Sequence, residues 1–278
     1  MEKDVNPVFE KMQYSEMKLW EGEIPHLLPE ADTPNTLECY VMKCAEPRPA
    51  VIIFPGGAYR NRARHEAEPI AHFYNSRGYH AFVCHYRIKP NQYPSMLLDA
   101  QRAIKLVRAH ADEWHVDPDR VFTLGFSAGG HLSAMTATMQ DVSKIGDAYD
   151  DINVKPNGAI LCYPLISLED EFGHEGCGRT LLGDRYDEEK VNFSAQYLVD
   201  ENTCPCFMWQ TSDDLLHPQN MFAFARALRE HKVLFEMHIW PHGPHGLGLG
   251  FDIEDLRAWG PLSADWISRN GNGCEPRV

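Results

Sequence analysis

The chain has 278 residues with a formal net charge of −14, and 44% of the residues are apolar against 24% charged. These proportions are typical of a globular protein with a sizeable core, and they exclude low-complexity and fibrous classes. The acidic excess argues against nucleic acid or an anionic membrane surface as a partner, because both select for lysine and arginine.

Short apolar runs alternate with helical patterns along the chain, which predicts an α/β protein with a mainly parallel sheet. Strands are expected at residues 50–54, 78–86, 120–124, 159–163, 206–210 and 233–239. Helices are expected at residues 94–111, 128–139 and 219–230, followed by a C-terminal helix from Ile253 that Gly260-Pro261 interrupts. Neither a linker nor a repeat divides the sequence, so we expect one domain over residues 1–278.

Residues 165–203 break this alternation with a polar stretch that contains four glycines. A connection of this length is more often a functional lid than a structureless tether, so we expect a small cap over the site. The alternative is a plain surface loop. The larger side chains that would wall off a small pocket are Phe172, His174, Leu181, Leu182 and Tyr186.

Residues 125–129 read Gly-Phe-Ser-Ala-Gly and fit the pattern G-x-S-x-G. A strand is expected before this segment and a helix after it, which is the context of a nucleophile elbow. Small neighbours let the backbone turn sharply and expose the Ser127 hydroxyl, and the helix N-terminus favours developing negative charge. The pattern therefore predicts Ser127 as a nucleophile. The alternative is a tight turn with an idle serine.

A serine nucleophile needs a base, and His245 is the preferred one because it lies in the loop 241–246 after the last predicted strand. His242 is its neighbour in the same loop and is expected to be a surface histidine. His131 follows Ser127 on the same helix and is expected to make a structural hydrogen bond. His217 lies close to the acidic loop and is a further alternative.

The base in turn needs a carboxylate to orient it, and Asp213 and Asp214 follow the strand at 206–210. Asp214 is preferred because it precedes Pro218 by four residues, and Asp213 stays open as the alternative. The order Ser127, Asp214, His245 matches the chain order of nucleophile, acid and base in α/β-hydrolases.

An oxyanion in such a site needs backbone donors. The Ala128 amide directly follows the nucleophile, and Gly56 and Gly57 follow a buried strand on a loop whose glycines can turn their amides inward. A phosphate-binding loop is the rival interpretation of this Gly-Gly pair. It is disfavoured because neither a Walker lysine nor G-x-G-x-x-G accompanies the pair.

Six segments carry a family resemblance: residues 54–59, 64–71, 93–99, 117–120, 125–132 and 242–250. Together they resemble the acetyl-xylan-esterase-like group of α/β-hydrolase esterases, known as BD-FAE and related to hormone-sensitive lipase, over residues 36–250. Two positions depart from the pattern. Pro55 stands where many relatives have histidine, and Ala58 replaces a third glycine.

The resemblance implies an α/β-hydrolase fold, with a mainly parallel central sheet flanked by helices and a small cap insertion. It also implies a serine carboxylic-ester hydrolase that removes short acyl groups, namely acetyl from acetylated xylo-oligosaccharides or similar small esters. Ser127 would form an acyl-enzyme with His245 as base and then acid, and neither a metal nor an organic cofactor is expected. Substrate contacts are expected from Tyr59, His174 and Trp209.

Three alternative functions remain open at this stage: a general short-chain carboxylesterase, a serine peptidase of the prolyl-oligopeptidase type, and a non-catalytic hydrolase-fold binding protein. A small-molecule or oligosaccharide ester is the expected partner, and the oligomeric state, including a homo-oligomer, stays open. Eight cysteines lack the paired spacing of a zinc site and are expected to be thiols. Residues 1–9 lack the apolar segment of a secretion signal, so a cytoplasmic location is expected.

Overall fold

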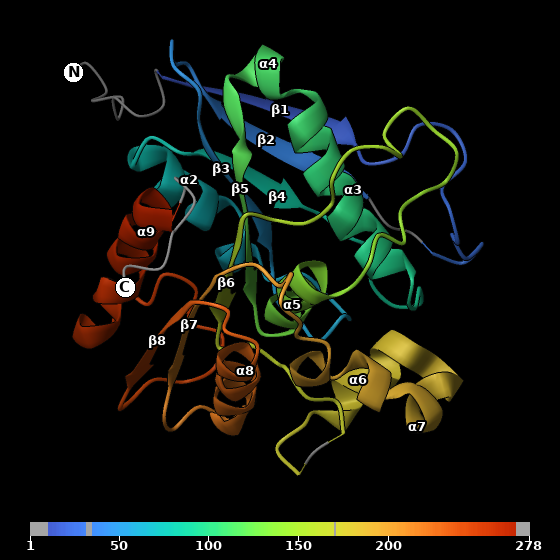
Figure 1. Cartoon of the computed structure of the whole chain (residues 1–278), viewed down its shortest axis with the longest axis vertical. Helices are drawn as coiled ribbons and strands as arrows, with labels where there is room; N and C mark the ends of the chain where they lie inside the picture. The colour runs from blue at the N-terminus through green and yellow to red at the C-terminus, as the bar shows by residue number, and fades with distance from the viewer. Residues whose placement is uncertain (1–10, 32–34, 170, 271–278) are drawn as a thin grey trace, which may run out of the picture.

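The computed structural model describes residues 11–31, 35–169 and 171–270. In these ranges eight strands form one sheet in the order β1-β2-β4-β3-β5-β6-β7-β8 (Figure 1). β1 and β2 pair antiparallel, β2 pairs antiparallel with β4, and all other neighbours are parallel. The strands are β1 (Met12–Lys18), β2 (Thr36–Met42), β3 (Arg48–Phe54), β4 (His80–Cys84), β5 (Val116–Phe126), β6 (Gly158–Cys162), β7 (Cys206–Thr211) and β8 (Phe235–Trp240).

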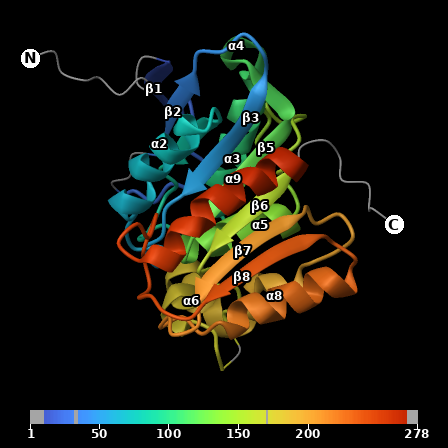
Figure 2. The same cartoon turned by 90° about the vertical axis from the view of Figure 1, so that its left-hand side faces the viewer.

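Helices cover both faces of the sheet and create two cores. α2 and α9 lie across the face turned toward the viewer in Figure 2, and α3, α5 and α8 cover the other face. Strand β3 shows how the sheet supplies both cores, since Val51 and Ile53 face α2 and α9 whereas Ile52 and Phe54 face the opposite layer. The helices are α2 (Glu68–Ser76), α3 (Ser95–Ala109), α4 (Ala111–Trp114), α5 (Ala128–Thr138), α6 (Glu175–Leu182), α7 (Tyr186–Glu189), α8 (Gln219–Glu230) and α9 (Trp259–Asn270).

The predicted α/β-hydrolase fold is confirmed, and every expected strand and helix is present with small shifts of its ends. One expectation is wrong. Gly260-Pro261 does not interrupt the last helix, because both residues lie in the first turn of α9, where proline needs no amide hydrogen bond. The antiparallel strands β1 and β2 and the helix α2 were not expected from the sequence patterns.

The segment 165–203 folds into α6, α7 and short 3-10 turns, which gather beside α5 in Figure 1. Leu181, Leu182 and Tyr186 are buried in the core on the α3 and α5 side of the sheet. They therefore stabilise the segment itself, and the expectation that they wall off a pocket is wrong. The helical spacing of these residues turns their apolar face inward onto the domain.

The cysteines at positions 39, 44, 84, 162, 177, 204 and 206 are free thiols, and Cys274 lies outside the described residues. Among the described residues there is no group of three or more His, Cys, Asp or Glu side chains that could hold a metal ion. Within the same ranges, every helix is too short or too polar to cross a membrane.

Candidate active site

Ser127 sits at a sharp turn between β5 and α5, with backbone angles φ 53° and ψ −116°. Bulky neighbours would prevent this turn. A Cβ on Gly125 would lie 1.9 Å from the Gly129 carbonyl oxygen, and a Cβ on Gly129 would lie 2.0 Å from that of Phe54. Both glycines of the motif are therefore required for the close approach of helix and strand, and the resulting strain exposes the serine hydroxyl.

A hydrogen-bonded chain of three side chains starts at this turn. Ser127 Oγ lies 2.8 Å from His245 Nε2. Nδ1 of the same ring lies 2.8 Å from Asp214 Oδ1 and 3.0 Å from its Oδ2. The Asp214 side chain is 1% exposed and that of His245 is 19% exposed, so the chain runs from the interior to a cavity wall. This is the arrangement in which an imidazole accepts a proton from a serine.

The alternative residues form a separate pair nearby. Asp213 Oδ2 lies 3.0 Å from His242 Nδ1, and its Oδ1 accepts the Gly243 amide at 2.8 Å. These bonds, first that from His242, lower the pKa of the Asp213 carboxyl. The side chains of Asp213 and His242 are 49% and 84% exposed. This pair orders the turn before His245 and makes no contact with Ser127.

The other two histidines have local structural partners. His131 is buried, with Tyr59 Oη 2.7 Å from its Nδ1 and the Phe193 carbonyl 2.8 Å from its Nε2. Burial lowers the pKa of His131 to about 4, so the ring is neutral in the folded protein. His217 lies at the start of α8, where its Nδ1 accepts the Gln219 amide at 3.0 Å. Neither ring lines the cavity beside Ser127.

Two expected substrate contacts are wrong, because Tyr59 and Trp209 are fully buried. Tyr59 has a positive φ of 59°, and this turn sends its ring into the core toward His131 rather than toward solvent. Trp209 lies in β7 on the face that packs against α9, where its ring stacks on Trp259 with centroids 5.1 Å apart. The alternation of side chains along the strand fixes that direction.

Ser127 and His245 open into a cavity of about 350 Å³. His174, the third expected substrate contact, does line this cavity. The cavity is also lined by polar groups that the sequence patterns did not single out and by apolar side chains. The remaining lining residues are Gly57, Ala58, Arg60, Asn61, Ala63, His65, Glu66, Leu165, Cys177, Leu215, Leu216 and Gly246. Most of them belong to the loop after β3, which the motif Gly56-Gly57 had already marked.

The two glycines of that loop have different hydrogen-bonding states. The Gly56 amide donates to Glu66 Oε2 at 2.7 Å, so its expected role as an oxyanion donor is wrong. Gly57 has φ 135° and a Cβ there would meet Asn61 Oδ1 at 2.0 Å, so the position requires glycine. In the described part of the chain, no acceptor is found for the amides of Gly57 and Ala128. Gly57 lines the same cavity as Ser127, and Ala128 directly follows Ser127 in the sequence.

Glu66 belongs to the segment 64–71 that carries the family resemblance, but the sequence patterns gave it no role in the site. It is buried at the end of the 3-10 turn η1 (Arg64–Glu66), and burial raises the pKa of its carboxyl. The Tyr163 hydroxyl donates to its Oε1 at 2.7 Å. Polar segments such as the one around Glu66 are common in surface turns. Only the fold therefore reveals that this carboxyl is buried and lines the same cavity as Ser127.

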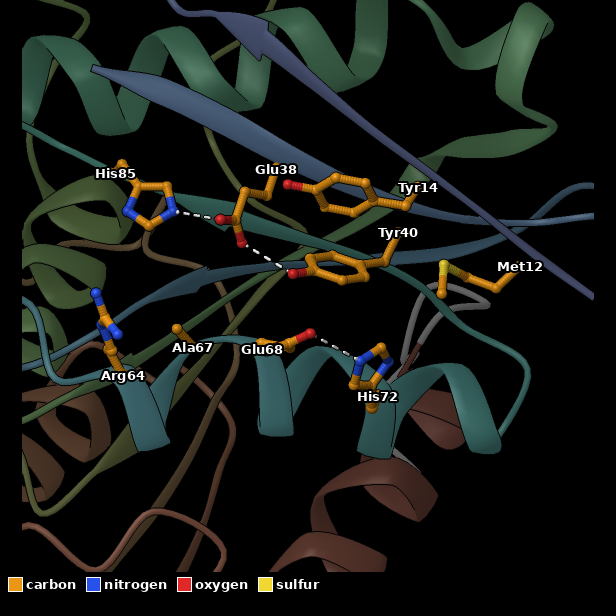
Figure 3. Close-up of a pocket in the computed structure, with 9 residues that line it drawn as sticks. All are labelled: Met12, Tyr14, Glu38, Tyr40, Arg64, Ala67, Glu68, His72 and His85. Atoms are coloured by element: carbon orange, nitrogen blue, oxygen red, sulfur yellow. Dashed lines mark hydrogen bonds and ion pairs between the residues drawn. The ribbon is translucent and has the colours of Figure 1, made fainter. Parts of the chain in front are cut away.

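A second cavity, of about 570 Å³, is lined by residues of β1, β2 and α2 (Figure 3). The Glu38 carboxylate connects two of its walls, since it lies 3.0 Å from His85 Nε2 and accepts the Tyr40 hydroxyl at 2.9 Å. Its lining residues are Met12, Tyr14, Glu38, Tyr40, Arg64, Ala67, Glu68, His72 and His85. None of the predicted catalytic residues lines this cavity, whereas Ser127 and His245 line the smaller one.

Comparison with known proteins finds relatives and solved structures that are named as esterases and hydrolases. The BD-FAE family model matches residues 37–226. The solved structure of an acetyl ester-xyloside bifunctional hydrolase from Caldicellulosiruptor lactoaceticus superposes with a TM-score of 0.87 at 41% identity, covering 92% of this chain and 96% of that one.

Two curated relatives have related names. Endo-1,4-beta-xylanase B of Butyrivibrio fibrisolvens is 37% identical over 76% of this chain, and the acetylxylan esterase of Xylanibacter ruminicola is 31% identical over 72% of it. The matches cover 34% and 41% of those two proteins, so the chain spans well under half of the length of either.

Proposed function

Because this chain belongs to the BD-FAE family, we propose that it is a carboxylic ester hydrolase that removes acetyl groups from acetylated xylo-oligosaccharides by a serine mechanism. The observation that carries the mechanism is the hydrogen-bonded chain from Asp214 through His245 to Ser127 at the wall of the small cavity.

In the first half of the reaction, Ser127 Oγ attacks the ester carbonyl carbon while His245 Nε2 takes the hydroxyl proton. The carbonyl oxygen becomes an oxyanion, which the amides of Gly57 and Ala128 stabilise by hydrogen bonds. The tetrahedral intermediate then expels the sugar oxygen, which receives the proton from His245. An acetyl group stays on Ser127.

In the second half, water replaces the sugar. His245 takes a proton from the water as its oxygen attacks the acetyl carbonyl carbon, and the proton returns to Ser127 Oγ as acetate leaves. Asp214 accepts the hydrogen bond from Nδ1 throughout, so it holds the ring orientation and stabilises the transient positive charge.

The cavity composition supports a small acyl group on a polar alcohol. Leu165, Leu215 and Leu216 supply apolar walls, and Arg60 and His174 supply hydrogen-bonding groups beside them. A sugar hydroxyl surface needs such polar partners, whereas the methyl of an acetyl group needs only a short apolar pocket. The relatives named for acetylxylan and for acetyl ester-xyloside support the same substrate class.

Acetate release from a panel of esters tests this proposal. We expect kcat/KM to be higher for acetylated xylo-oligosaccharides than for acetylated manno-oligosaccharides and simple alkyl acetates, with Ser127→Ala inactive on all of them. Equal values across the panel would contradict the xylan assignment and favour a general short-chain carboxylesterase. Activity retained by Ser127→Ala would contradict the serine mechanism itself.

A further inference from the structure

Glu66 is a buried carboxyl beside the reacting groups that the proposed reaction leaves unused. It lines the small cavity together with Ser127 and His245. No lysine or arginine pairs with it among the described residues. The basic side chain within ion-pair distance of it is His65, whose Nε2 lies 3.8 Å from Glu66 Oε1. Burying a carboxyl group without a strong counter-charge costs folding free energy. The hydrogen bonds that Glu66 makes are therefore expected to serve the site.

Glu66 and Tyr163 form a hydrogen-bond network that ends at the backbone amides of Gly56 and Gly248. These two amides fix the direction of every hydrogen bond in the network. Backbone N–H groups only donate, so Tyr163 Oη accepts from the Gly248 amide at 2.9 Å. The Tyr163 proton is then left for Glu66 Oε1 at 2.7 Å, while Glu66 Oε2 accepts the Gly56 amide at 2.7 Å. Every donor and acceptor in this network has a partner when Glu66 carries no proton. Hydrogen bonds to such a charged carboxylate are stronger than those between neutral groups.

This hydrogen-bond network joins two loops that supply different parts of the site. Gly56 directly precedes the oxyanion donor Gly57, and Gly248 lies three residues after His245. The Tyr163 ring also packs against the His245 ring, with centroids 5.1 Å apart. Its backbone is held at a positive φ of 36°, a conformation that a bulky residue adopts only under constraint.

We propose that Glu66 is a positioning residue for ester hydrolysis, which fixes the oxyanion loop through the Gly56 amide and the histidine loop through the Tyr163 hydroxyl. The inference rests on the proposed serine mechanism and adds the element that aligns its two halves. Glu66 touches neither the ester nor the nucleophile in this role. Its effect is to keep the Gly57 amide and the His245 ring at fixed positions around Ser127 before the substrate arrives.

Alignment of an oxyanion donor acts in the transition state, so its loss lowers kcat more than it raises KM. Displacing a catalytic group by about 1 Å costs on the order of 100-fold. We therefore expect Glu66→Ala, assayed on p-nitrophenyl acetate, to lower kcat by about 100-fold with KM changed by less than about threefold. Glu66→Gln keeps an acceptor for the Gly56 amide, so it should recover about tenfold of that loss.

Tyr163→Phe provides the second arm, since it keeps the buried ring and removes only the hydroxyl between the two loops. We expect kcat to fall by about tenfold, and the double variant with Glu66→Ala to be no more than about twofold worse than Glu66→Ala alone, because each substitution breaks the same connection between the two loops. The matched control is Tyr74→Phe. It removes a buried hydroxyl that bonds Ser263 Oγ at 2.7 Å, outside the cavity, and should leave kcat unchanged.

Thermal unfolding of each variant separates positioning from folding. If Glu66→Ala does not fold, Glu66→Gln and Tyr163→Phe decide the matter, since both preserve volume. Wild-type kcat in Tyr163→Phe and Glu66→Gln would overturn the proposal, as would a loss confined to KM or an equal loss in Tyr74→Phe. Activity retained by Ser127→Ala would instead overturn the serine mechanism, so the two failures are distinguishable.

Discussion

Two Asp–His pairs lie side by side in this molecule and differ mainly in burial. Asp214 and His245 are 1% and 19% exposed, whereas Asp213 and His242 are 49% and 84% exposed. Both pairs have carboxylate-to-imidazole contacts of 3.0 Å or less. Only the buried pair continues to a hydroxyl, because His245 Nε2 lies 2.8 Å from Ser127 Oγ.

The comparison shows that hydrogen-bond geometry alone does not distinguish the two aspartate–histidine pairs, whereas burial and the contact with Ser127 do. In the exposed pair, water competes for both partners and salt screens their attraction, so the pair is worth little even structurally. In the buried pair, the Asp214 carboxylate is removed from water and its attraction to a charged imidazole is stronger. Adjacent aspartates reach these two environments because one faces the interior and the other caps the Gly243 amide.

Substitution of the two histidines should give the largest difference in kcat. We expect His245→Ala to lower kcat on p-nitrophenyl acetate by up to about a millionfold, because the nucleophile loses its base. His242→Ala should stay within about twofold of wild type, since the exposed ring contributes little. Steady-state kinetics of the two purified variants measure the contrast. A larger loss in His242→Ala would reverse the roles of the two pairs.

Substitution of the two aspartates should give the next largest difference in kcat. Asp214→Asn is expected to lower kcat by on the order of ten-thousand-fold, because the amide no longer holds the productive tautomer of His245. Asp213→Asn should cost less than about threefold, since it disturbs only a surface pair. Circular dichroism of both variants serves as the control for folding. The opposite ranking would assign the acid role to Asp213.

The cavity that the buried pair faces should select short acyl groups. Each methylene that finds no room forfeits about 0.8 kcal/mol of burial and adds a clash, so kcat/KM should fall steadily from acetyl to butyryl to octanoyl p-nitrophenyl esters. The cavity holds about 350 Å³ for acyl group and alcohol together, which leaves little space for a long chain. A preference for octanoyl would contradict the acetyl assignment and leave the three catalytic side chains unchanged.

The exposed pair should show its small contribution in stability. The hydrogen bond from His242 lowers the pKa of the Asp213 carboxyl, so its stabilising effect is present above the ordinary value of 3.8 and is lost as pH falls through the lowered value. Because the pair is exposed, Asp213→Asn should lower Tm at pH 7 by no more than about 2 °C. The difference should vanish once the pH has fallen below the lowered pKa of the Asp213 carboxyl. A larger or pH-independent change would show that the Asp213 carboxylate stabilises the turn in another way.

Much of this arrangement could be predicted because it is encoded locally. The glycines around Ser127 and the β-branched runs before it specify the elbow and the central strands without reference to the rest of the chain. The parallel core from β3 to β8 follows from the same alternation. By contrast, the edge strand β1 and its neighbour β2 have mixed sequences that carry a weak pattern, and only the pairing of β1 with β2 and of β2 with β4 establishes them.

For two aromatic residues and for Glu66, the sequence patterns misjudged which way the side chain points. Tyr59 and Trp209 are aromatic residues close to predicted catalytic loops, but a positive φ and a strand alternation turn them into the core. Glu66 is the converse case, since a charged residue in a polar turn becomes buried only when Gly56 and Tyr163 fold onto it. Long-range packing sets these directions, and local propensity does not contain it.

Covalent labelling with a fluorophosphonate, followed by peptide mapping, tests the central claim most directly, namely that the buried pair activates Ser127. The reagent bonds to an activated serine oxygen with loss of fluoride, so the label reports activation independently of any substrate. We predict a single label on Ser127, formed at the wild-type rate in Asp213→Asn and at least about 100-fold more slowly in Asp214→Asn. A label on another residue, or equal labelling rates in the two aspartate variants, would contradict the account.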